Sequence, residues 1–418
     1  MSLLTTRRFL PLFITQFLGA FNDNVFKNAL VMMITFKLAP SLGGSAQMLV
    51  TLAGAVFILP YFLLSATAGQ VADKFDRARV ARAAKAWEIF VVAVAACGFY
   101  LHNAYFLLFV LFCLGVQATF FGPVKYALLP QHLRDDELIT GNAYIEAGMF
   151  MAILLGTIAG GVIILRPEGE HWIAASMVAV ALGGYIASRF IPPAPAPSPG
   201  LSVSKDIARA TWRIIQHDRK NPRVFKSIVA ISWFWLVGAT FLAQFPNYTK
   251  DILHGDETVV TLLLTLFSVG IGAGSLLCNL LLKGQVKATF VPYAALGLSL
   301  FAADLFFAYP GGVSEGALQN AWQFMAQPAH WRVMFDLFAF TVCGGLYIVP
   351  LYAIMQHDSD PNFRARTIAT NNVLNALFMV ASAIITLAML AAGFSVLHVF
   401  LATAIANLPV AVWLLRFR

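Results

Sequence analysis

The chain has 418 residues, of which 59% are hydrophobic and only 11% are charged, and its formal net charge at pH 7 is +8. Its mean hydropathy is +0.76, and a water-soluble globular protein this apolar would have too few polar residues to cover its surface. The composition therefore excludes a soluble domain and indicates a membrane protein. The positive charge is typical of loops that face anionic lipid, and no pattern indicates a nucleic-acid partner.

Twelve apolar runs are each long enough to cross a bilayer core of about 30 Å as a helix. The first run carries polar residues and is too long for a cleavable signal segment, so it is expected to remain as the first span. All four cysteines fall inside spans, so no disulfide framework is expected. The sequence predicts an all-α membrane protein with spans at 9–36, 46–68, 80–101, 104–129, 138–165, 172–191, 224–252, 258–282, 287–309, 332–355, 364–392 and 394–415.

The first span contains an unusual polar segment, residues 19–30. Asp23 and Lys27 are four residues apart and therefore lie on one helix face, next to Asn24. Charges at the bilayer centre cost a few kcal/mol each on insertion scales, so they normally face the bundle interior and are paired. Two interpretations follow: a structural ion pair that joins the first span to a neighbour, or a direct role in binding or gating. We favour the direct role.

Residues 69–79, GQVADKFDRAR, form the most densely charged connection, between the second and third spans. Gly69 permits close helix approach, Asp73 can lie at the positive N-terminal end of a neighbouring helix, and Lys74, Arg77 and Arg79 can pair with it or face anionic lipid. The segment resembles motif A of the major facilitator superfamily, except that Asp76 stands where that family usually has glycine. All five residues, Gly69, Asp73, Lys74, Arg77 and Arg79, are predicted to gate the cytoplasmic side.

If this connection is cytoplasmic, most of the Lys and Arg residues lie on the cytoplasmic side, and both termini are cytoplasmic too. Residues 191–200, IPPAPAPSPG, form a proline-rich spacer after the sixth span. In residues 205–219, Ile207, Ala208, Trp212 and Ile215 recur near helical spacing, which predicts either a helix on the cytoplasmic leaflet or a solvated linker helix. The predicted division is a first bundle at 1–191, a linker at 192–223 and a second bundle at 224–418.

The two halves resemble repeats. Asn142 and Glu146 on the fifth span share their spacing with Asn371 and Asn375 on the eleventh. The counterpart of motif A in the second half, near residues 283–287, lacks the aspartate, so the two halves are expected to close their gates differently. Lys125 on the fourth span and Glu146 form a second candidate ion pair, structural or ligand-binding. Three other acids, nearer to span ends, are expected to be hydrated or to cap helices: Glu88, Asp304 and Asp336.

The segments QFLGAFNDN and FKNAL in the first span, FFGPVKYALLPQ in the fourth and GNAYIEAG in the fifth are similar to the lysophospholipid transporter branch of the superfamily. The likeness is closest to the transporter portion that some bacteria fuse ahead of an acyltransferase and an acyl-carrier-protein ligase. It is dense in the first half and thinner in the second.

This resemblance implies the major facilitator fold, with twelve transmembrane helices in two pseudo-symmetric six-helix bundles and a substrate site between them near the midplane. It also implies a flippase of the bacterial inner membrane that moves lysophosphatidylethanolamine-type lipids from the outer to the inner leaflet. A cytoplasmic acyltransferase or acyl-acyl-carrier-protein ligase would then be its partner in re-acylation.

A zwitterionic headgroup needs a carboxylate for its ammonium, here Asp23 or Glu146, and a cation for its phosphate, here Lys27 or Lys125. An ion-coupled exporter of a siderophore, drug or other amphiphile would share the fold and would use the same carboxylates for protons, so this alternative stays open. The predicted substrate-binding residues are Asp23, Asn24, Lys27, Lys125, Tyr126, Asn142, Glu146, Asn371 and Asn375.

An enzymatic role is not indicated. An acyltransferase of the fused kind needs a histidine with an aspartate five positions later, and none of the eight histidines has one. The chain also contains no GxxxxGK[ST] phosphate-binding loop, so ATP-driven transport is not indicated either. Neither a cofactor nor a metal ion is expected.

Overall fold

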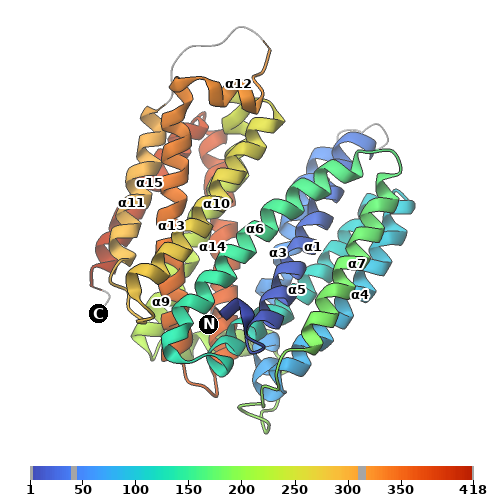
Figure 1. The fold of residues 1–418 in the computed structure, drawn as a ribbon, viewed down its shortest axis with the longest axis vertical. Coiled ribbons are helices and arrows are strands. Elements are labelled where there is room, and N and C mark those ends of the chain that lie inside the picture. Colours follow the sequence, from blue (N-terminus) through green and yellow to red (C-terminus); the bar gives the residue numbers. More distant parts are fainter. Residues whose placement is uncertain (1–2, 39–44, 309–316, 417–418) are drawn as a thin grey trace.

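The computed structural model describes residues 3–38, 45–308 and 317–416, which are folded largely into helices (Figure 1). A first group of long helices packs together into one bundle, which also holds the short helices η1 (Leu3–Thr5), η2 (Met33–Leu38) and η3 (Asp135–Glu137). Its long helices are α1 (Leu10–Met32), α3 (Ser45–Lys74), α4 (Arg77–Tyr100), α5 (Ala104–His132), α6 (Leu138–Ile164) and α7 (Gly169–Arg189).

The second bundle follows a connection that contains α8 (Ile207–Asp218). Three short helices join its spans: η4 (Tyr248–Ile252), α12 (Ala321–Ala326) and η5 (Pro328–His330). Its long helices are α9 (Pro222–Asn247), α10 (Glu257–Leu282), α11 (Val291–Phe307), α13 (Trp331–Asp358), α14 (Arg364–Ala391) and α15 (Val396–Leu414).

These long helices correspond one for one to the predicted spans, so the prediction of an all-α protein with twelve spans is confirmed. Within the described residues, nine helices are long and apolar enough to cross a membrane, and α11 is apolar but shorter. The other two, α1 and α4, carry charged residues within their apolar runs, such as Asp23 and Lys27 in α1 and Lys85 and Glu88 in α4.

The connection at residues 69–79 is shorter than predicted. Helix α3 continues to Lys74 and α4 begins at Arg77, so only Phe75 and Asp76 lie between them. Asp76 caps α4, because its Oδ1 accepts a hydrogen bond from the Arg79 backbone N–H at 2.9 Å. Its φ of −53° is open to any residue, which explains why glycine is not needed there.

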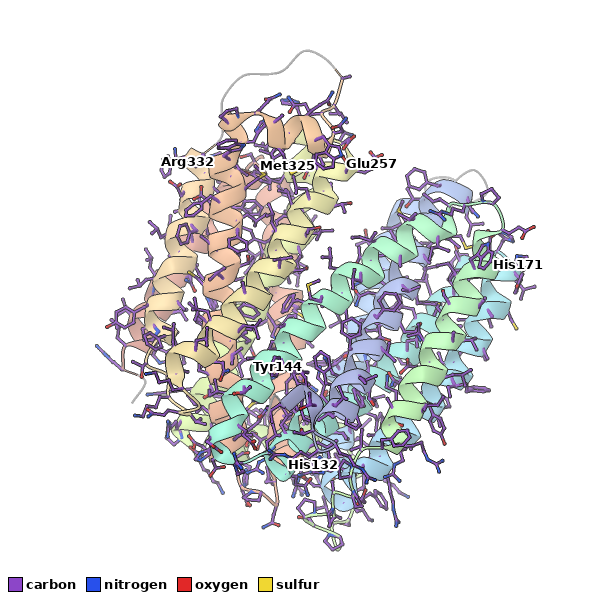
Figure 2. The ribbon with its side chains drawn as sticks, viewed as in Figure 1. His132, Tyr144, His171, Glu257, Met325 and Arg332 are labelled. Carbon is purple, nitrogen blue, oxygen red and sulfur yellow. The ribbon has the colours of Figure 1, made fainter. Side chains whose placement is uncertain are left out.

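The two bundles meet at one end of the molecule and separate toward the other (Figure 1). We call these the closed end and the open end. His132 lies at the closed end, whereas His171 of the first bundle and Glu257 of the second lie at the open end on separate arms (Figure 2). Toward the closed end, α3 packs along α14 and α6 packs along α10.

Helix α8 packs against both bundles at the closed end. Its buried residues Ala210, Ile214 and Asp218 are four apart, and the first two contact Ala66 of α3 and Ala369 of α14. The sequence predicted a different apolar face, and Trp212 from that face is 56% exposed. The small side chains of the observed face allow α8 to lie close to the two spans.

Asp218 anchors α8 to α14, because its carboxylate accepts hydrogen bonds from the hydroxyls of Thr367 at 2.8 Å and Thr370 at 2.5 Å. Burial raises the pKa of Asp218 above its ordinary value, and the hydrogen bonds from Thr370 and Thr367 act in the opposite direction. The helix is therefore held by a buried polar contact as well as by apolar packing.

Candidate functional site

At the closed end, a buried carboxylate joins the two bundles. Asp73 is fully buried, and its Oδ1 accepts hydrogen bonds from Arg77 Nη2 at 2.8 Å and from the Ala365 backbone N–H at 3.1 Å. Its Oδ2 accepts from Arg366 Nε at 2.9 Å and from the Arg366 backbone N–H at 3.3 Å. Because Ala365 and Arg366 lie in the first turn of α14, the carboxylate meets the positive end of that helix. We call Asp73, Arg77 and Arg366 the closed-end lock.

The other predicted gating residues divide into two groups. A Cβ on Gly69 would lie 2.8 Å from Ala369 Cβ and 2.9 Å from the Ala365 carbonyl oxygen, so glycine allows α3 to approach α14. Lys74 and Arg79 form no salt bridge within the described residues, and Arg79 is exposed. The structure therefore brings Gly69, Asp73 and Arg77 together at the contact between bundles, but not Lys74 or Arg79.

Two further contacts between the bundles involve predicted substrate residues. The side-chain amides of Asn142 and Gln356, both fully buried, exchange hydrogen bonds of 2.8 and 2.9 Å. The rings of Tyr126 and Tyr352 stack with centroids 4.5 Å apart and an interplanar angle of 6°. Asn142 thus contacts the opposite bundle, which is a geometry that suits gating better than substrate binding.

An ion pair that the sequence analysis missed lies inside the first bundle. Lys85 Nζ lies 2.6 Å from Glu88 Oε2, and each side chain is only 1% exposed. Glu88 also accepts hydrogen bonds from Asn22 at 3.2 Å and Gln117 at 3.1 Å. Helices α1, α4 and α5 therefore meet at one carboxylate. The sequence did contain a signal for this pair, because two opposite charges lie three residues apart within an apolar run.

The expectation that Glu88 would be hydrated or capping is therefore wrong, because α4 starts earlier than predicted and places Glu88 at mid-helix. Asp336 is only 2% exposed, so the same expectation is wrong there too. Asp304 does lie in a solvated position, where it pairs with Arg332 at 2.5 Å.

Asp23 and Lys27 of α1 are both half-buried, and they form no salt bridge with one another within the described residues. Asp23 Oδ1 is buried and has no hydrogen-bond partner there. The interpretation of Asp23 and Lys27 as a structural ion pair would require a salt bridge, and none is formed between them. The charged groups that act on the Asp23 carboxylate are Glu88, Lys85, Lys27 and Lys125.

Lys125 and Glu146 are likewise not joined by a salt bridge in the described part of the chain. Glu146 is fully buried, and its Oε1 accepts a hydrogen bond from the Tyr126 hydroxyl at 2.7 Å, while Oε2 has no partner. The Lys125 ammonium lies 3.8 Å from Met149 Sδ and 4.7 Å from the centre of the Tyr126 ring. Lys125 is thus a cation without a carboxylate contact.

The remaining predicted residues are neutral amides. Asn24 Nδ2 donates to the Ala20 carbonyl oxygen of its own helix at 2.8 Å. Asn371 is fully buried in α14, and Asn375 Oδ1 accepts a hydrogen bond from the Ser232 hydroxyl at 2.8 Å. These side chains contribute polarity to the interior but no charge.

The charged members of the predicted set, by contrast, lie within helices and form no salt bridge in the described part of the chain; they are Asp23, Lys27, Lys125 and Glu146. Lys27 and Lys125 can bind an anionic group, and the free oxygen of Asp23 can accept a hydrogen bond from an ammonium. No group of three or more His, Cys, Asp or Glu in the described residues could hold a metal ion.

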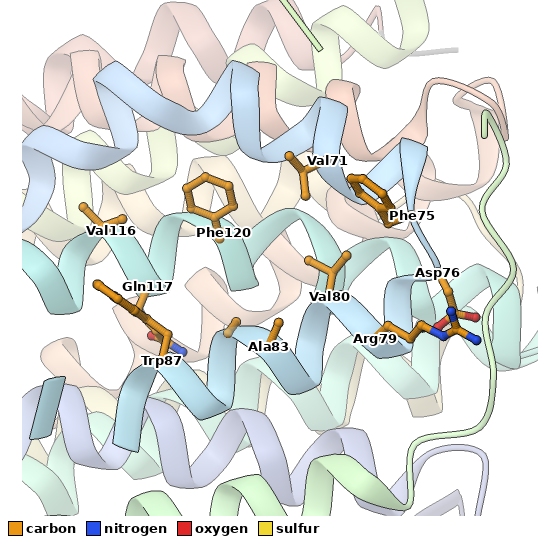
Figure 3. A pocket seen from close by; sticks show the side chains of 11 residues that line it. Val71, Phe75, Asp76, Arg79, Val80, Ala83, Trp87, Val116, Gln117 and Phe120 are labelled. Atoms are coloured by element: carbon orange, nitrogen blue, oxygen red, sulfur yellow. Dashed lines mark hydrogen bonds between the residues drawn. The ribbon is translucent and has the colours of Figure 1, made fainter. Parts of the chain in front are cut away.

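A groove of about 490 Å³ lies between α3, α4 and α5 (Figure 3). Its lining is mostly apolar, with Asp76 and Arg79 at one end. Gln117 lines the groove and also donates to Glu88, but Asp23, Lys27 and Lys125 do not line it. The groove is therefore distinct from the set of unpaired charges, which we take as the candidate substrate site.

The protein-family model described as Major Facilitator Superfamily matches residues 12–383 of the chain. Among curated proteins, the lysophospholipid transporter LplT of Serratia proteamaculans is 27% identical over 84% of this chain and 81% of its own length. The lysophospholipid transporter LplT of Citrobacter koseri is 28% identical over 82% of this chain and 78% of its own.

Solved structures show the same fold at low sequence identity. A human organic anion transporter superimposes with a TM-score of 0.75 at 14% identity, covering 98% of this chain and 99% of its own. The transporter FucP in its outward conformation gives a TM-score of 0.70 at 13% identity, covering 98% of each chain.

Proposed function

Because the chain belongs to the Major Facilitator Superfamily, we propose that it is a lysophospholipid transporter that works by alternating access. Its substrates are lysophosphatidylethanolamine-type lipids, which move from the outer to the inner leaflet of the bacterial inner membrane. A cytoplasmic acyltransferase or acyl-acyl-carrier-protein ligase then re-acylates them. The similarity to proteins named lysophospholipid transporters over more than four-fifths of this chain supports this substrate class.

One observation carries the proposal at the level of the site: within the described residues, Asp23 keeps a buried oxygen without a hydrogen-bond partner, and neither Lys27, one turn along the same helix, nor Lys125 forms a salt bridge. Unpaired charges inside a membrane protein are costly, so a ligand that neutralises both signs would be bound favourably. A lysophosphatidylethanolamine headgroup carries both signs. Lys27 and Lys125 would bind its phosphate, and Asp23 its ammonium.

The two ends of the molecule can be assigned to the two sides of the membrane. We place the closed end in the cytoplasm, because most Lys and Arg residues of the chain belong to that side. The state described above is then open to the outside and ready to accept a lipid from the outer leaflet. Release to the inner leaflet requires Asp73 to separate from the N-terminus of α14.

The test is translocation of a fluorescent lysophosphatidylethanolamine in proteoliposomes, measured by the fraction protected from a membrane-impermeant quencher, with and without an ion gradient. Asp23→Asn keeps the side-chain shape and removes the charge, and we expect it to slow translocation at least tenfold. Asp304→Asn, at a solvated acid outside the site, is the matched control. Near wild-type flipping by Asp23→Asn would refute the role of Asp23.

The same assay with a panel of siderophores and drugs separates the two transporter classes. Lysolipid movement with no movement of the panel supports the flippase. Movement of a siderophore or drug that depends on an ion gradient, without lysolipid movement, would establish the exporter instead.

A charge swap tests the site further. Because Lys125 and Glu146 do not form a salt bridge, the double variant Lys125→Glu, Glu146→Lys should fold but transport poorly. Its expression and monodispersity are the control for folding. Normal lysolipid flipping by the swapped protein would refute a role of these two residues in binding the headgroup.

A further inference from the structure

A second pocket, of about 550 Å³, lies at the closed end between α3, α8, α14 and the connection that precedes α8. Its lining gathers positive side chains from two parts of the chain. We call it the basic pocket, and its polar lining includes Gln70, Ser202, Arg213, His217, Lys220 and Arg366.

Arg366 lines this pocket, and several contacts hold its side chain in place. Its Nε donates to Asp73 at 2.9 Å and its Nη2 donates to the Asn362 carbonyl oxygen at 2.6 Å. The guanidinium carbon lies 4.0 Å from the centre of the Phe363 ring, on which His217 also stacks at 3.6 Å. Two bonds and a ring contact hold the guanidinium in place, and Nη1 makes no hydrogen bond to the described residues. One donor nitrogen of a preorganised guanidinium is therefore free.

Arg213 and Lys220 add two exposed cations, neither of which forms a salt bridge within the described residues. The two acids near the pocket, Asp73 and Asp218, already have partners. Asp73 binds Arg77 and Arg366, and Asp218 accepts hydrogen bonds from two threonine hydroxyls of α14. Among the described residues, the pocket lining contains no carboxylate of its own. Although Arg366 is paired with Asp73 and His217 Nδ1 lies 3.6 Å from Asp218 Oδ1, Arg213 and Lys220 leave the pocket with an excess of positive charge.

We propose that the basic pocket binds a phosphate group, and that its occupancy favours opening of the closed end. Guanidinium groups bind phosphate through geometrically matched, charge-assisted hydrogen bonds, and flexible lysine and arginine side chains complete such sites. The phosphate belongs either to the headgroup of an anionic lipid in the adjoining leaflet or to a soluble phosphate compound.

The coupling arises because Asp73 and the phosphate share Arg366. While Asp73 contacts Arg366, its negative charge partly neutralises the guanidinium and repels a second anion. Once Asp73 leaves α14, the whole charge of Arg366 is available to the phosphate. The ligand therefore binds the opened state more tightly and, by linkage, shifts the equilibrium toward that state.

Binding is measured by titrating inorganic phosphate into the full chain in phosphatidylcholine nanodiscs. The double variant Arg213→Gln, Lys220→Gln should bind at least tenfold more weakly than wild type. The matched control is Arg209→Gln, Arg219→Gln, which removes the same charge from exposed residues outside the pocket lining. Asp73→Asn should bind phosphate at least threefold more tightly, a gain that a merely solvated cluster would not show.

The second arm distinguishes the lipid source and reports the gate. Spin labels at Arg134→Cys and Lys283→Cys, both exposed at the closed end, measure the distance between the bundles in a background without the native cysteines. Nanodiscs that contain phosphatidic acid are compared with phosphatidylcholine nanodiscs with and without inorganic phosphate. Longer distances with phosphatidic acid alone identify a lipid headgroup, and longer distances with inorganic phosphate identify a soluble ligand.

Either of these outcomes supports the proposal. It is overturned if neither probe binds or changes the distance, or if the pocket double variant responds like its control. Unchanged or weaker binding of both probes by Asp73→Asn overturns the coupling to the lock. None of these results depends on lysolipid transport, so this proposal and the proposed function fail independently.

Discussion

Two of the contacts between the bundles at the closed end differ in chemistry. Along α3 and α14, a fully buried carboxylate accepts four hydrogen bonds, two of them from the backbone at the start of α14. Along α6 and α10, the Thr140 hydroxyl donates to Asn279 Oδ1 at 2.6 Å, and Gly284, at a φ of +77°, packs against the Asp136 backbone. We call these the charged seam and the neutral seam.

The difference indicates that the two seams separate in different ways when the closed end opens. Losing one partner of a buried ion pair leaves an uncompensated charge, so the charged seam favours two discrete states. A neutral hydrogen bond contributes only about 1 kcal/mol net, so the neutral seam can change gradually. This agrees with the absence of an aspartate near residues 283–287, from which the sequence analysis expected the two gates to close differently.

The interiors of the bundles show a weaker form of the same contrast. The first bundle contains the Lys85 and Glu88 ion pair and the unpaired charges of the candidate site. Buried contacts in the second include neutral ones, such as the 2.7 Å bond between the hydroxyls of Thr240 and Ser382. The second bundle also buries an acid, Asp336, whose Oδ2 has no hydrogen-bond partner in the described residues, so the two interiors differ in the number of their buried charges rather than in kind.

The largest expected effect comes from breaking the charged seam with Asp73→Ala. It leaves Arg77, only 1% exposed, without its carboxylate and removes the contacts to α14. Breaking a buried pair costs roughly 3–5 kcal/mol, so the open form of the closed end should gain at least a hundredfold in population. The measurement is the rate at which a maleimide labels Ala369→Cys in a background without the native cysteines, with Asp251→Ala, at an exposed acid outside both seams, as control. A labelling rate equal to that of the control would contradict the lock.

A smaller effect is expected when the charged seam is overpacked and its charges are kept. Gly69→Ala places a Cβ within 3 Å of Ala369 and of the α14 backbone, and overpacking costs about 1–3 kcal/mol. Gly54→Ala, on the same helix with nothing within 4 Å of its added Cβ, is the matched control. The same labelling assay should show faster reaction for Gly69→Ala and no change for Gly54→Ala. Equal rates in both would mean that the close approach of α3 to α14 does not hold the gate.

The smallest effect is expected at the neutral seam. Thr140→Val keeps the size of the side chain and removes its hydrogen bond to Asn279, a loss of about 1 kcal/mol. Thr403→Val removes a hydroxyl that bonds only to its own helix, and serves as control. Opening should increase less than fivefold in Thr140→Val. An increase as large as that of Asp73→Ala would show that both seams act as locks, and the comparison would fail.

Local features of the sequence were sufficient for the spans and for the placement of Asp73 at the start of a neighbouring helix. Apolar runs of bilayer length mark each helix, because hydropathy adds up along the chain and needs no knowledge of its neighbours. The position of Asp73 at a helix N-terminus also followed from its residue type and spacing, although the sequence did not identify α14 as that helix. The domain limits 1–191, 192–223 and 224–418 remain a prediction.

The partners of the buried charges were decided by the tertiary structure alone. The sequence offered Asp23 with Lys27 and Lys125 with Glu146 as candidate ion pairs, yet neither salt bridge forms within the described residues. The overlooked Lys85 and Glu88 pair, in contrast, is completed by Asn22 and Gln117 from other helices. Likewise, α8 buries Ala210 and Ile214 rather than its predicted face, because the shapes of α3 and α14 select the side that fits. The physical reason is common to both cases. A buried charge or a packed face is stabilised by whatever surrounds it, and those surroundings come from segments far away in the sequence.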